Sequence, residues 1–479
     1  MNIYRLYITS ILFILCDISL HSIPAYPHKI AVKVGEETVY IRLFGDEHSK
    51  RAESIDGYTL LQKEDCWYYA EKDGDGWIKA SPYRLTSVQS QELTHFLNKT
   101  PKHLKNQELT DANTHKTQRY TSRKTRSAVG NRKILIILMQ FTDVPFVRTQ
   151  QDFDLLFNGI NYTEDDARGS VYDYYNDVSY GQLQLTCNIV GPFTSQHNRD
   201  YYGKNDRSGN DLNPIALFEE AMEYASQYVR FNEYDADQDG YIDNVHIVFA
   251  GHGEEAGASS NAIWSHEMSF DSGFPYQDML VDRYSCAPEL RGNSGEGISR
   301  IGPHCHEIGH ALGAMDYYDT NYERNGYFEG TGQWDIMASG SWNEEGVIPA
   351  DFNPYVKMVD FGWIEVPELP KGQVQIYPSS DGNNNYFLLS NTSNDYYLIE
   401  NRNRSRWGGG LPGEGLLLFH IHPNVASSGN DINSSYPQKC YPVCASSNFA
   451  MPSSSPTSYG NINSDGCPFP GSSRKNTFS

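Results

Sequence analysis

The chain has 479 residues, of which 39% are hydrophobic, and this is enough to bury a large core and to form about two to four domains. Its formal net charge of −22 excludes nucleic acid and anionic membranes as main partners, because neither offers the positive charge that an acidic protein binds. We therefore expect an acidic globular protein that can bind cations.

The amino terminus has the pattern of a secretory signal peptide. A single basic residue precedes an apolar stretch from Leu6 to Cys16 that is too short to span a bilayer. We predict a signal peptide over residues 1–22, cleaved after Ser22 or alternatively after Ala25. A lipid anchor on Cys16 is disfavoured by the bulky residue before it. The protein is thus expected to be exported, either secreted or held at the cell surface or in the periplasm, with no transmembrane segment in the mature chain.

The next part of the chain predicts a small β unit followed by an exposed linker. Short alternating runs between Ala31 and about Tyr83 are separated by Gly, Asp and Lys, as in an antiparallel β unit. The stretch KNQELTDANTHKTQRYTSRKTRSAVGNRK then lacks apolar periodicity and is rich in Lys, Arg, Ser and Thr. In an exported protein such a linker is an accessible site for an activating protease; the alternative is a spacer that is never cut.

The middle of the chain predicts an α/β core. KILIILMQF (133–141) is a continuous apolar run, typical of a strand buried on both faces. Residues 213–227 have apolar positions at helical spacing, and VHIVFAG (245–251) is a second buried strand. Beyond about Pro367 the composition shifts to Ser, Asn, Gly and Pro with short strand-like runs, so residues 367–479 are expected to be mostly β and loop.

Residues 304–319 read HCHEIGHALGAMDYYD and contain a metal-binding spacing. His306, Glu307 and His310 form H-E-x-x-H. Residues four apart lie on one face of a helix, so both imidazoles can point at one zinc ion while Glu307 takes a proton from the metal-bound water. The alternative is that the pentapeptide arises by chance in an ordinary polar helix.

The residues that follow extend this pattern. Gly313 can end the helix in a left-handed conformation, so that the chain turns back and brings Asp316 to the same metal as an oxygen ligand. In the metzincin pattern that position is a histidine. Met337, within WDIMASGSW, lies in a Gly/Ser-rich turn, as expected of the methionine turn beneath such a site, although a methionine is more often ordinary core.

A second metal is predicted in DADQDGYID, where closely spaced carboxylates surround a glycine turn that suits calcium. The predicted ligands are Asp235, Asp237, Asp239, the carbonyl of Tyr241 and Asp243. The twelfth loop position is a histidine within a predicted strand, so this is not a true EF-hand. The alternative is an acidic turn whose carboxylates are satisfied by its own backbone amides.

Several motifs besides HEIGHALGAMDYYD occur in a characteristic order. They are GSVYDYYNDVSYGQL (169–183), DADQDGYIDNVHIVFAGHGEEAG (235–257), IWSHE (263–267), WDIMASGSWN (334–343), and LIENRN followed by LPGEGLLLFHI. From about Lys133 onward the chain resembles the immune-inhibitor-A-type secreted bacterial metallopeptidases. The resemblance continues weakly through the amino-terminal segment, where that family carries a pro-peptide.

The resemblance implies an α/β (α+β) catalytic domain of the metzincin-like zincin type over residues 127–366. It also implies a pro-peptide and basic linker over 23–126 and a β-rich region over 367–479 that would continue further in the family. By the same resemblance, His306 and His310 are zinc ligands and Glu307 is the general base.

The chain departs from the family at the residue before the third ligand. The family usually has a proline there, and this chain has Met315. Glu329 and Glu400 are alternative third ligands if Asp316 does not reach the metal.

The expected function is therefore that of a zinc-dependent endopeptidase made as a zymogen, which acts on protein or peptide substrates. Tyr317 and Tyr318 lie near enough in sequence to stabilise an oxyanion, but proximity alone assigns neither. One alternative is a calcium-dependent adhesion or carbohydrate-binding protein with an inert zincin core. Another is a zinc hydrolase acting on a non-peptide bond.

Overall fold

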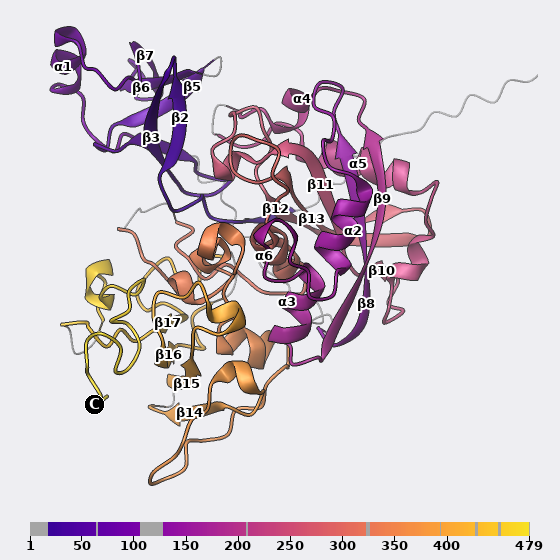
Figure 1. Ribbon diagram of the computed structural model, residues 1–479, viewed down its shortest axis with the longest axis vertical. Helices are drawn as coiled ribbons and strands as arrows, with labels where there is room; N and C mark the ends of the chain where they lie inside the picture. The colour runs from indigo at the N-terminus through magenta and orange to yellow at the C-terminus, as the bar shows by residue number, and fades with distance from the viewer. Residues whose placement is uncertain are drawn as a thin grey trace, which may run out of the picture.

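The computed structural model describes residues 18–478, with gaps at 64–65, 106–127, 207–208, 322–325, 393, 427–429 and 449–451. Most of the predicted linker and residues 1–17 of the predicted signal peptide therefore lie outside the described residues, whereas the last five residues of that predicted peptide, Ile18–Ser22, form a strand of the central sheet. Figure 1 shows three β-sheets, with helix α6 (Ile301–Ala311) near the centre of the molecule. Among the described residues, no helix has the length and apolar character that crossing a membrane requires.

The amino-terminal sheet is an antiparallel meander of six strands in chain order, at the upper left of Figure 1. Its strands are β2 (Ile30–Val34), β3 (Glu37–Phe44), β4 (Arg51–Ser54), β5 (Thr59–Lys63), β6 (Cys66–Lys72) and β7 (Ile78–Arg84). Helix α1 (Gln91–Leu97) follows, and the Ser90 side chain caps it by accepting from the N–H of Leu93. The antiparallel β unit expected from the alternating pattern is thus observed.

The central sheet is mixed and has the strand order β1-β12-β13-β11-β8-β9, with β10 paired to β13. Its strands are β1 (Ile18–Ser22), β8 (Gly130–Gln140), β9 (Leu183–Thr194), β10 (Tyr241–Ile242), β11 (Val245–His252), β12 (His266–Tyr276) and β13 (Met279–Leu290). Strands β9, β8, β11 and β13 run parallel, β12 runs antiparallel to them, and β1 pairs antiparallel with β12 at the edge. The predicted α/β class is confirmed.

Strand β8 is buried on both faces, as its apolar run predicts. Ile134, Ile136 and Leu138 face one hydrophobic core, and the alternate residues Leu135 and Ile137 face another. The first core contains residues of α2 (Gln150–Asn158), α3 (Val171–Val178) and α6, and the second contains those of α5 (Pro214–Ala225). The sheet therefore supports α6 on the face that it shares with α2 and α3.

The carboxyl-terminal region forms a four-stranded antiparallel sheet, at the lower left of Figure 1. Its strands are β14 (Tyr386–Ser390), β15 (Tyr396–Arg402), β16 (Gly415–Ile421) and β17 (Cys440–Pro442). Leu398, Leu417 and Phe419 belong to the same hydrophobic core as α6. The β-rich region expected after Pro367 is therefore present, and it packs as part of the unit that holds α6.

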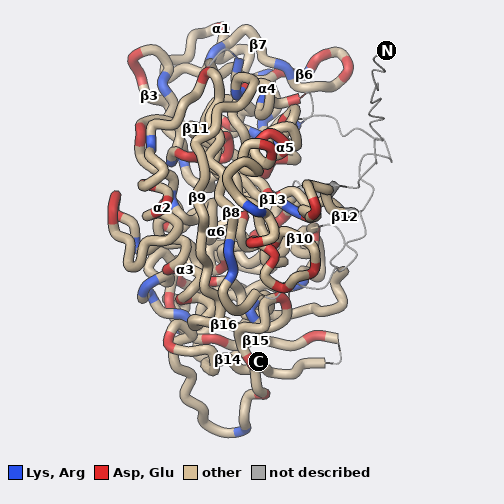
Figure 2. The backbone as a smooth tube through the Cα atoms, turned by 90° about the vertical axis from the view of Figure 1, so that its right-hand side faces the viewer, with Lys and Arg blue, Asp and Glu red and all other residues tan. Residues whose placement is uncertain are grey.

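The connections contain further short helical segments. They are α4 (Arg199–Gly203), the π-helical turn Val356–Asp360, and 3-10 helices at Glu164–Asp166, Phe231–Tyr234, Glu254–Ala256, Gly332–Trp334, Ser339–Gly346, Ser379–Asp381, Arg406–Gly408 and Pro456–Tyr459. Acidic and basic positions occur along the whole length of the molecule in Figure 2. Charged residues of both signs thus accompany all three sheets.

Candidate active site

Helix α6 carries the predicted motif in a fully buried setting. His306 and Glu307 are 0% exposed and His310 is 1% exposed. The helix ends at Ala311, and Gly313 then adopts a φ of 111°, which a residue with a side chain rarely tolerates. The turn expected at this glycine is therefore observed, and it directs the chain back toward the helix.

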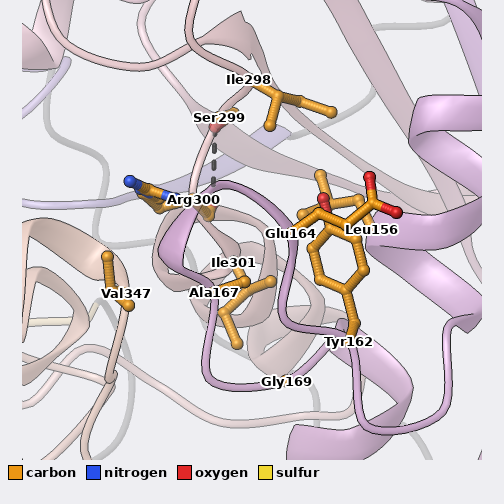
Figure 3. Close-up of a pocket in the computed structure, with 10 residues that line it drawn as sticks. All are labelled: Leu156, Tyr162, Glu164, Ala167, Gly169, Ile298, Ser299, Arg300, Ile301 and Val347. Atoms are coloured by element: carbon orange, nitrogen blue, oxygen red, sulfur yellow. Dashed lines mark hydrogen bonds between the residues drawn. The ribbon is translucent and has the colours of Figure 1, made fainter.

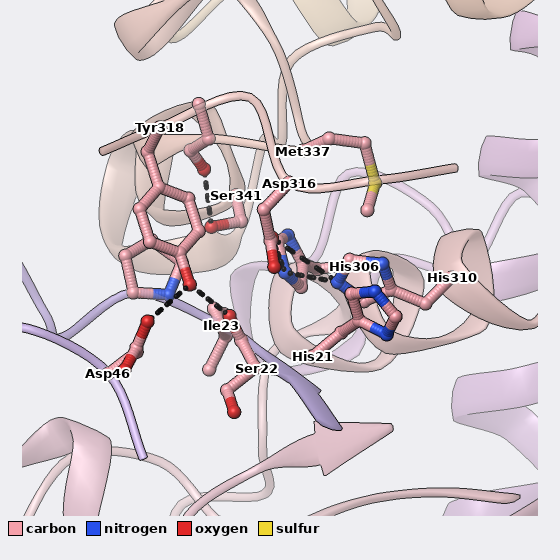
Figure 4. A network of polar contacts seen from close by, with 12 residues as sticks. His21, Ser22, Ile23, Asp46, His306, His310, Asp316, Tyr318, Met337 and Ser341 are labelled. Carbon is pink, nitrogen blue, oxygen red and sulfur yellow. Dashed lines mark hydrogen bonds and ion pairs between the residues drawn. The ribbon is translucent and has the colours of Figure 1, made fainter. Parts of the chain in front are cut away.

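Three side chains converge beyond this turn (Figure 4). The Nε2 atoms of His306 and His310 each lie 3.3 Å from Oδ1 of Asp316. The two Nε2 atoms lie 3.2 Å from each other. Met315 occupies the place of the family's usual proline, yet the turn still brings Asp316 to the two histidines.

Hydrogen bonds fix how these ligands point. Nδ1 of His306 lies 2.7 Å from the carbonyl oxygen of Ile336, and Nδ1 of His310 lies 2.8 Å from that of Ala314. A carbonyl only accepts, so each Nδ1 carries the proton and each Nε2 presents its lone pair to the centre. This tautomer is the one that a metal requires.

Asn430 orients the third side chain. Its amide nitrogen donates to Oδ2 of Asp316 at 2.7 Å, and its Oδ1 accepts from the Asp316 backbone N–H at 2.8 Å. Asn430 is 114 residues away in sequence. Sequence reasoning missed it, because an asparagine in a loop carries no spacing signal.

The donor set fits a divalent transition metal such as zinc. Oδ1 of Asp316 and Oε2 of Glu307 are buried without a hydrogen-bond partner among the described residues. Leaving such atoms unpaired is costly, and a cation at the centre would satisfy Oδ1 together with both Nε2 lone pairs. Two imidazoles, a carboxylate and room for a further ligand are typical of catalytic zinc sites.

The charges of the site depend on one another. Burial and then the neighbouring Asp316 carboxylate raise the pKa of Glu307 well above its usual range. Burial opposes ionisation of Asp316 as well, but the positive charge that His310 and His306 carry in the absence of a cation outweighs it and holds the pKa of Asp316 below its usual range. A bound cation would favour the charged form of both carboxylates, since opposite charge nearby stabilises an anion.

Helix α6 packs closely against Met337 at Gly309. A Cβ added at Gly309 would lie 2.8 Å from Sδ of Met337, which is closer than real Cβ contacts allow. The carbonyl of Met337 also accepts from the backbone N–H of Tyr317 at 2.7 Å, so the methionine turn contacts the segment that carries Asp316. Gly309 thus permits the close approach of α6 to Met337.

The alternative third ligands lie elsewhere. Glu329 accepts from Asn463 at 2.7 Å, and Glu400 pairs with Arg402 at 2.8 Å. Neither belongs to a group of side chains that could share a metal with His306 in the described part of the chain. Asp316 is therefore the residue that the fold brings to the histidines.

The other histidine at the start of the motif has a packing role. His304 is fully buried, and its Nδ1 lies 2.9 Å from Nε2 of His246, whose Nδ1 lies 2.8 Å from the Ser285 hydroxyl. Burial lowers the pKa of His304 to about 3. His304 and Cys305 thus lie in the core and not among the converging side chains.

Of the two neighbouring tyrosines, only Tyr318 faces the site. Its hydroxyl donates to the carbonyl oxygen of Ser22 at 2.6 Å and lies 3.2 Å from Oδ2 of Asp46 (Figure 4). Tyr317 is buried in the core beneath. The two neighbouring side chains therefore lie in different surroundings, which proximity in sequence could not reveal.

The predicted calcium loop has a different geometry. Asp235, Asp237 and Asp239 lie close enough to share a cation, but Asp235 accepts from two backbone amides of its own turn and Asp239 accepts from that of Tyr241. Oδ2 of Asp243 accepts from the backbone N–H of Ala236 at 2.9 Å and lies 3.2 Å from Nη1 of Arg132. This pattern favours the acidic turn satisfied by its own amides, and calcium binding there stays a prediction from the sequence.

A small pocket beside the start of α6 is separate from the metal-binding end (Figure 3). Ile298, Arg300 and Ile301 line it together with residues of the 156–169 segment. None of the converging side chains lines it. The chemistry of the candidate site therefore lies at the opposite, carboxyl-terminal part of α6.

Comparison with known proteins agrees with this geometry. The family model described as immune inhibitor A peptidase M6, catalytic domain, matches residues 121–362. The chain belongs to this family. It is 27% identical over 297 residues to the pre-pro-metalloprotease PrtV of Vibrio cholerae, covering 51% of this chain and 32% of that protein. It is 26% identical over 293 residues to immune inhibitor A of Bacillus thuringiensis, covering 50% of this chain and 41% of that protein. The chain thus spans about a third to two fifths of the length of these relatives.

Proposed function

We propose that this chain is a secreted zinc-dependent endopeptidase in which Glu307 is the general base. The observation that carries the proposal is the convergence of His306 Nε2, His310 Nε2 and Asp316 Oδ1 beside the unpaired carboxylate oxygen of Glu307. Zinc held there would polarise the scissile carbonyl and lower the pKa of a bound water to about 7.

The protein side chains would then handle protons and charge. Glu307 accepts the proton of the attacking water and passes it to the leaving amine, so that no covalent intermediate is needed. The Tyr318 hydroxyl donates a hydrogen bond to the carbonyl oxygen on which negative charge develops. Asn430 positions Asp316, and Met337 supports the helix from below.

We further propose that the amino-terminal segment makes the chain latent. His306, Glu307 and Asp316 are 0% exposed with this segment in place, so a substrate has no access to them. Ile23, the first residue that remains after the predicted cleavage at Ser22, donates its backbone N–H to Oε1 of Glu307 at 2.9 Å. The segment thus occupies the site itself.

Buried charges hold this segment in place. Lys50 pairs with Oε2 of Glu254 at 2.5 Å and with Oδ1 of Asp211 at 3.1 Å. Glu47 lies 3.4 Å from Nδ1 of His266. If the segment left, the charged groups on the catalytic domain would lose their partners, which is unfavourable for buried charges. These contacts therefore keep the segment docked until the chain is cut.

Two experiments test the proposal. Chelation followed by addition of zinc to the protease-treated protein should remove and then restore casein cleavage; activity that survives removal of all metal would contradict it. For latency, the full chain should gain casein-cleaving activity after brief digestion with a trypsin-like protease that cuts the basic linker. A full chain that is equally active before digestion would rule latency out.

The two alternative functions have less support. A calcium-dependent adhesion protein would not need a glutamate beside two histidines, and the acidic loop satisfies its own carboxylates. A hydrolase for non-peptide bonds would share the site but not the family membership. Turnover of peptides compared with esters by the processed protein separates the last alternative from the proposal.

A further inference from the structure

The amino-terminal segment crosses the site as an added strand. Strand β1 pairs antiparallel with the edge strand β12, with Ser22 opposite His266 and Leu20 opposite Met268. Strand addition binds a peptide through its main chain and so accepts many sequences. The edge of β12 is therefore a surface on which an extended peptide can bind up to the position of Ser22.

The peptide group after Ser22 lies against Tyr318 and Glu307. The Ser22 carbonyl oxygen accepts from Tyr318 at 2.6 Å (Figure 4). The Ile23 N–H donates to Glu307 at 2.9 Å. In peptide hydrolysis the carbonyl oxygen gains negative charge, and the nitrogen of the same peptide group must receive a proton. The bond between Ser22 and Ile23 therefore marks the place of the scissile bond.

The residue after this bond fills an apolar pocket. Ile23 is 0% exposed and packs in a small cluster with Trp264, Trp342 and Ala256. Both indoles also bind the main chain: Trp264 Nε1 donates to the Ile23 carbonyl at 2.9 Å and Trp342 Nε1 donates to the Pro24 carbonyl at 2.8 Å. The two tryptophans thus combine an apolar wall with hydrogen bonds that any peptide can accept.

We propose that Trp264 and Trp342 form the subsite for the two residues that follow the scissile bond, and that the enzyme prefers protein substrates with a branched aliphatic residue directly after it. The inference rests on the proposed peptidase function. A charged side chain would lose its hydration in this pocket without a partner, and alanine would leave apolar volume unfilled. Discrimination between aliphatic residues that differ by a few methylenes is about 10- to 200-fold in such pockets.

The test uses the full chain, loaded with zinc and activated with immobilised trypsin that is then removed. Its substrates are peptides that differ only in the residue after the intended scissile bond, which is isoleucine, alanine or aspartate. We expect kcat/KM to be at least about 10-fold higher for isoleucine than for alanine, and lower again for aspartate. Equal values for the three peptides, or cleavage at another bond by mass spectrometry, would overturn the subsite.

Variants assign the subsite to the two tryptophans. Trp342→Ala should reduce the preference for isoleucine over alanine, whereas Trp342→Phe should keep much of it and raise KM through loss of the indole N–H. Trp407→Phe is the matched control, because the Trp407 indole donates to Asp177 in the core and should not affect the preference. An unchanged preference in Trp342→Ala that still binds zinc would overturn the assignment.

The same assay distinguishes failure of the proposed subsite from failure of the proposed peptidase function. Cleavage of all peptides without preference would leave the peptidase function intact and reject the pocket. No cleavage of any peptide or of casein by the zinc-loaded, processed chain would reject the peptidase function and this inference with it. Cleavage that tracks the side chain after the bond supports both.

Discussion

Two regions of this chain have sequences typical of metal sites, but the hydrogen-bond partners of their carboxylates differ in the folded chain. At α6, buried ligand atoms converge. Oδ1 of Asp316 has no hydrogen-bond partner in the described chain, and Nδ1 of each histidine donates to a backbone carbonyl, which leaves Nε2 free for a metal. In the acidic loop, the carboxylates of Asp235 and Asp239 accept from the amides of their own turn, and most of the loop is exposed. Ligand spacing thus indicates a site only where the fold leaves the ligand atoms unsatisfied.

The largest expected effect separates the two regions directly. His310→Ala should eliminate bound zinc and reduce peptidase activity by more than about 100-fold. Loss of a residue that only hydrogen-bonds to a metal ligand can reduce activity by up to about 100-fold, and loss of the ligand itself should reduce it further. The matched variant Asp237→Ala should leave both unchanged. Elemental analysis and casein cleavage on the two proteins would measure this, and zinc retained in His310→Ala would contradict the assignment.

A smaller effect is expected from the residue that orients the third ligand. Asn430→Ala removes both hydrogen bonds to Asp316. It should weaken zinc binding by about 10- to 100-fold, which competition with a chelator would measure. Asn384→Ala, at an exposed position, is the control. Equal affinities in the two variants would mean that Asp316 does not depend on Asn430 for its orientation.

The contact beneath the helix should affect stability. Gly309→Ala places a Cβ 2.8 Å from Sδ of Met337. Such overpacking typically destabilises a protein by about 1–3 kcal/mol, which exceeds the stabilisation expected from the higher helix propensity of alanine. We expect a lower free energy of unfolding in urea. The double variant Gly309→Ala/Met337→Ala should relieve the overlap but leave a cavity. A single variant as stable as the wild type would show that Met337 moves aside without cost.

The smallest effect is expected at the acidic loop. Because the loop amides already satisfy Asp235 and Asp239, added calcium should leave the midpoint of thermal unfolding unchanged. Differential scanning calorimetry with and without calcium would measure this, with Asp237→Asn as the control. A calcium-dependent rise in the wild type that disappears in Asp237→Asn would restore the calcium site that the sequence predicts.

The sequence predicts the part of the site that depends on local geometry. His306, Glu307 and His310 share one helix, and Gly313 supplies the turn that brings Asp316 back, so helical spacing and one φ angle are sufficient. The buried strands and the antiparallel amino-terminal unit follow in the same way from period and apolar runs. Each of these patterns is read from residues close together in the chain.

The parts that could not be predicted depend on distant contacts. Asn430 reaches Asp316 across 114 residues, and Arg132 binds Asp243 at the end of the acidic loop across 111 residues. The strand at Ile18–Ser22 meets β12 only in the folded chain, so its place in the site carries no signal in its own residues. Pairing over such separations is set by the tertiary fold.

The most direct test of the central claim compares the processed wild type with Glu307→Gln for zinc content and casein cleavage, side by side. We predict equal zinc in both proteins and a fall in activity of about 10²- to 10⁴-fold in the variant, because only the proton transfer is lost. Equal activity in both proteins, or absence of zinc from the wild type, would contradict the proposal that α6 carries a zinc peptidase site.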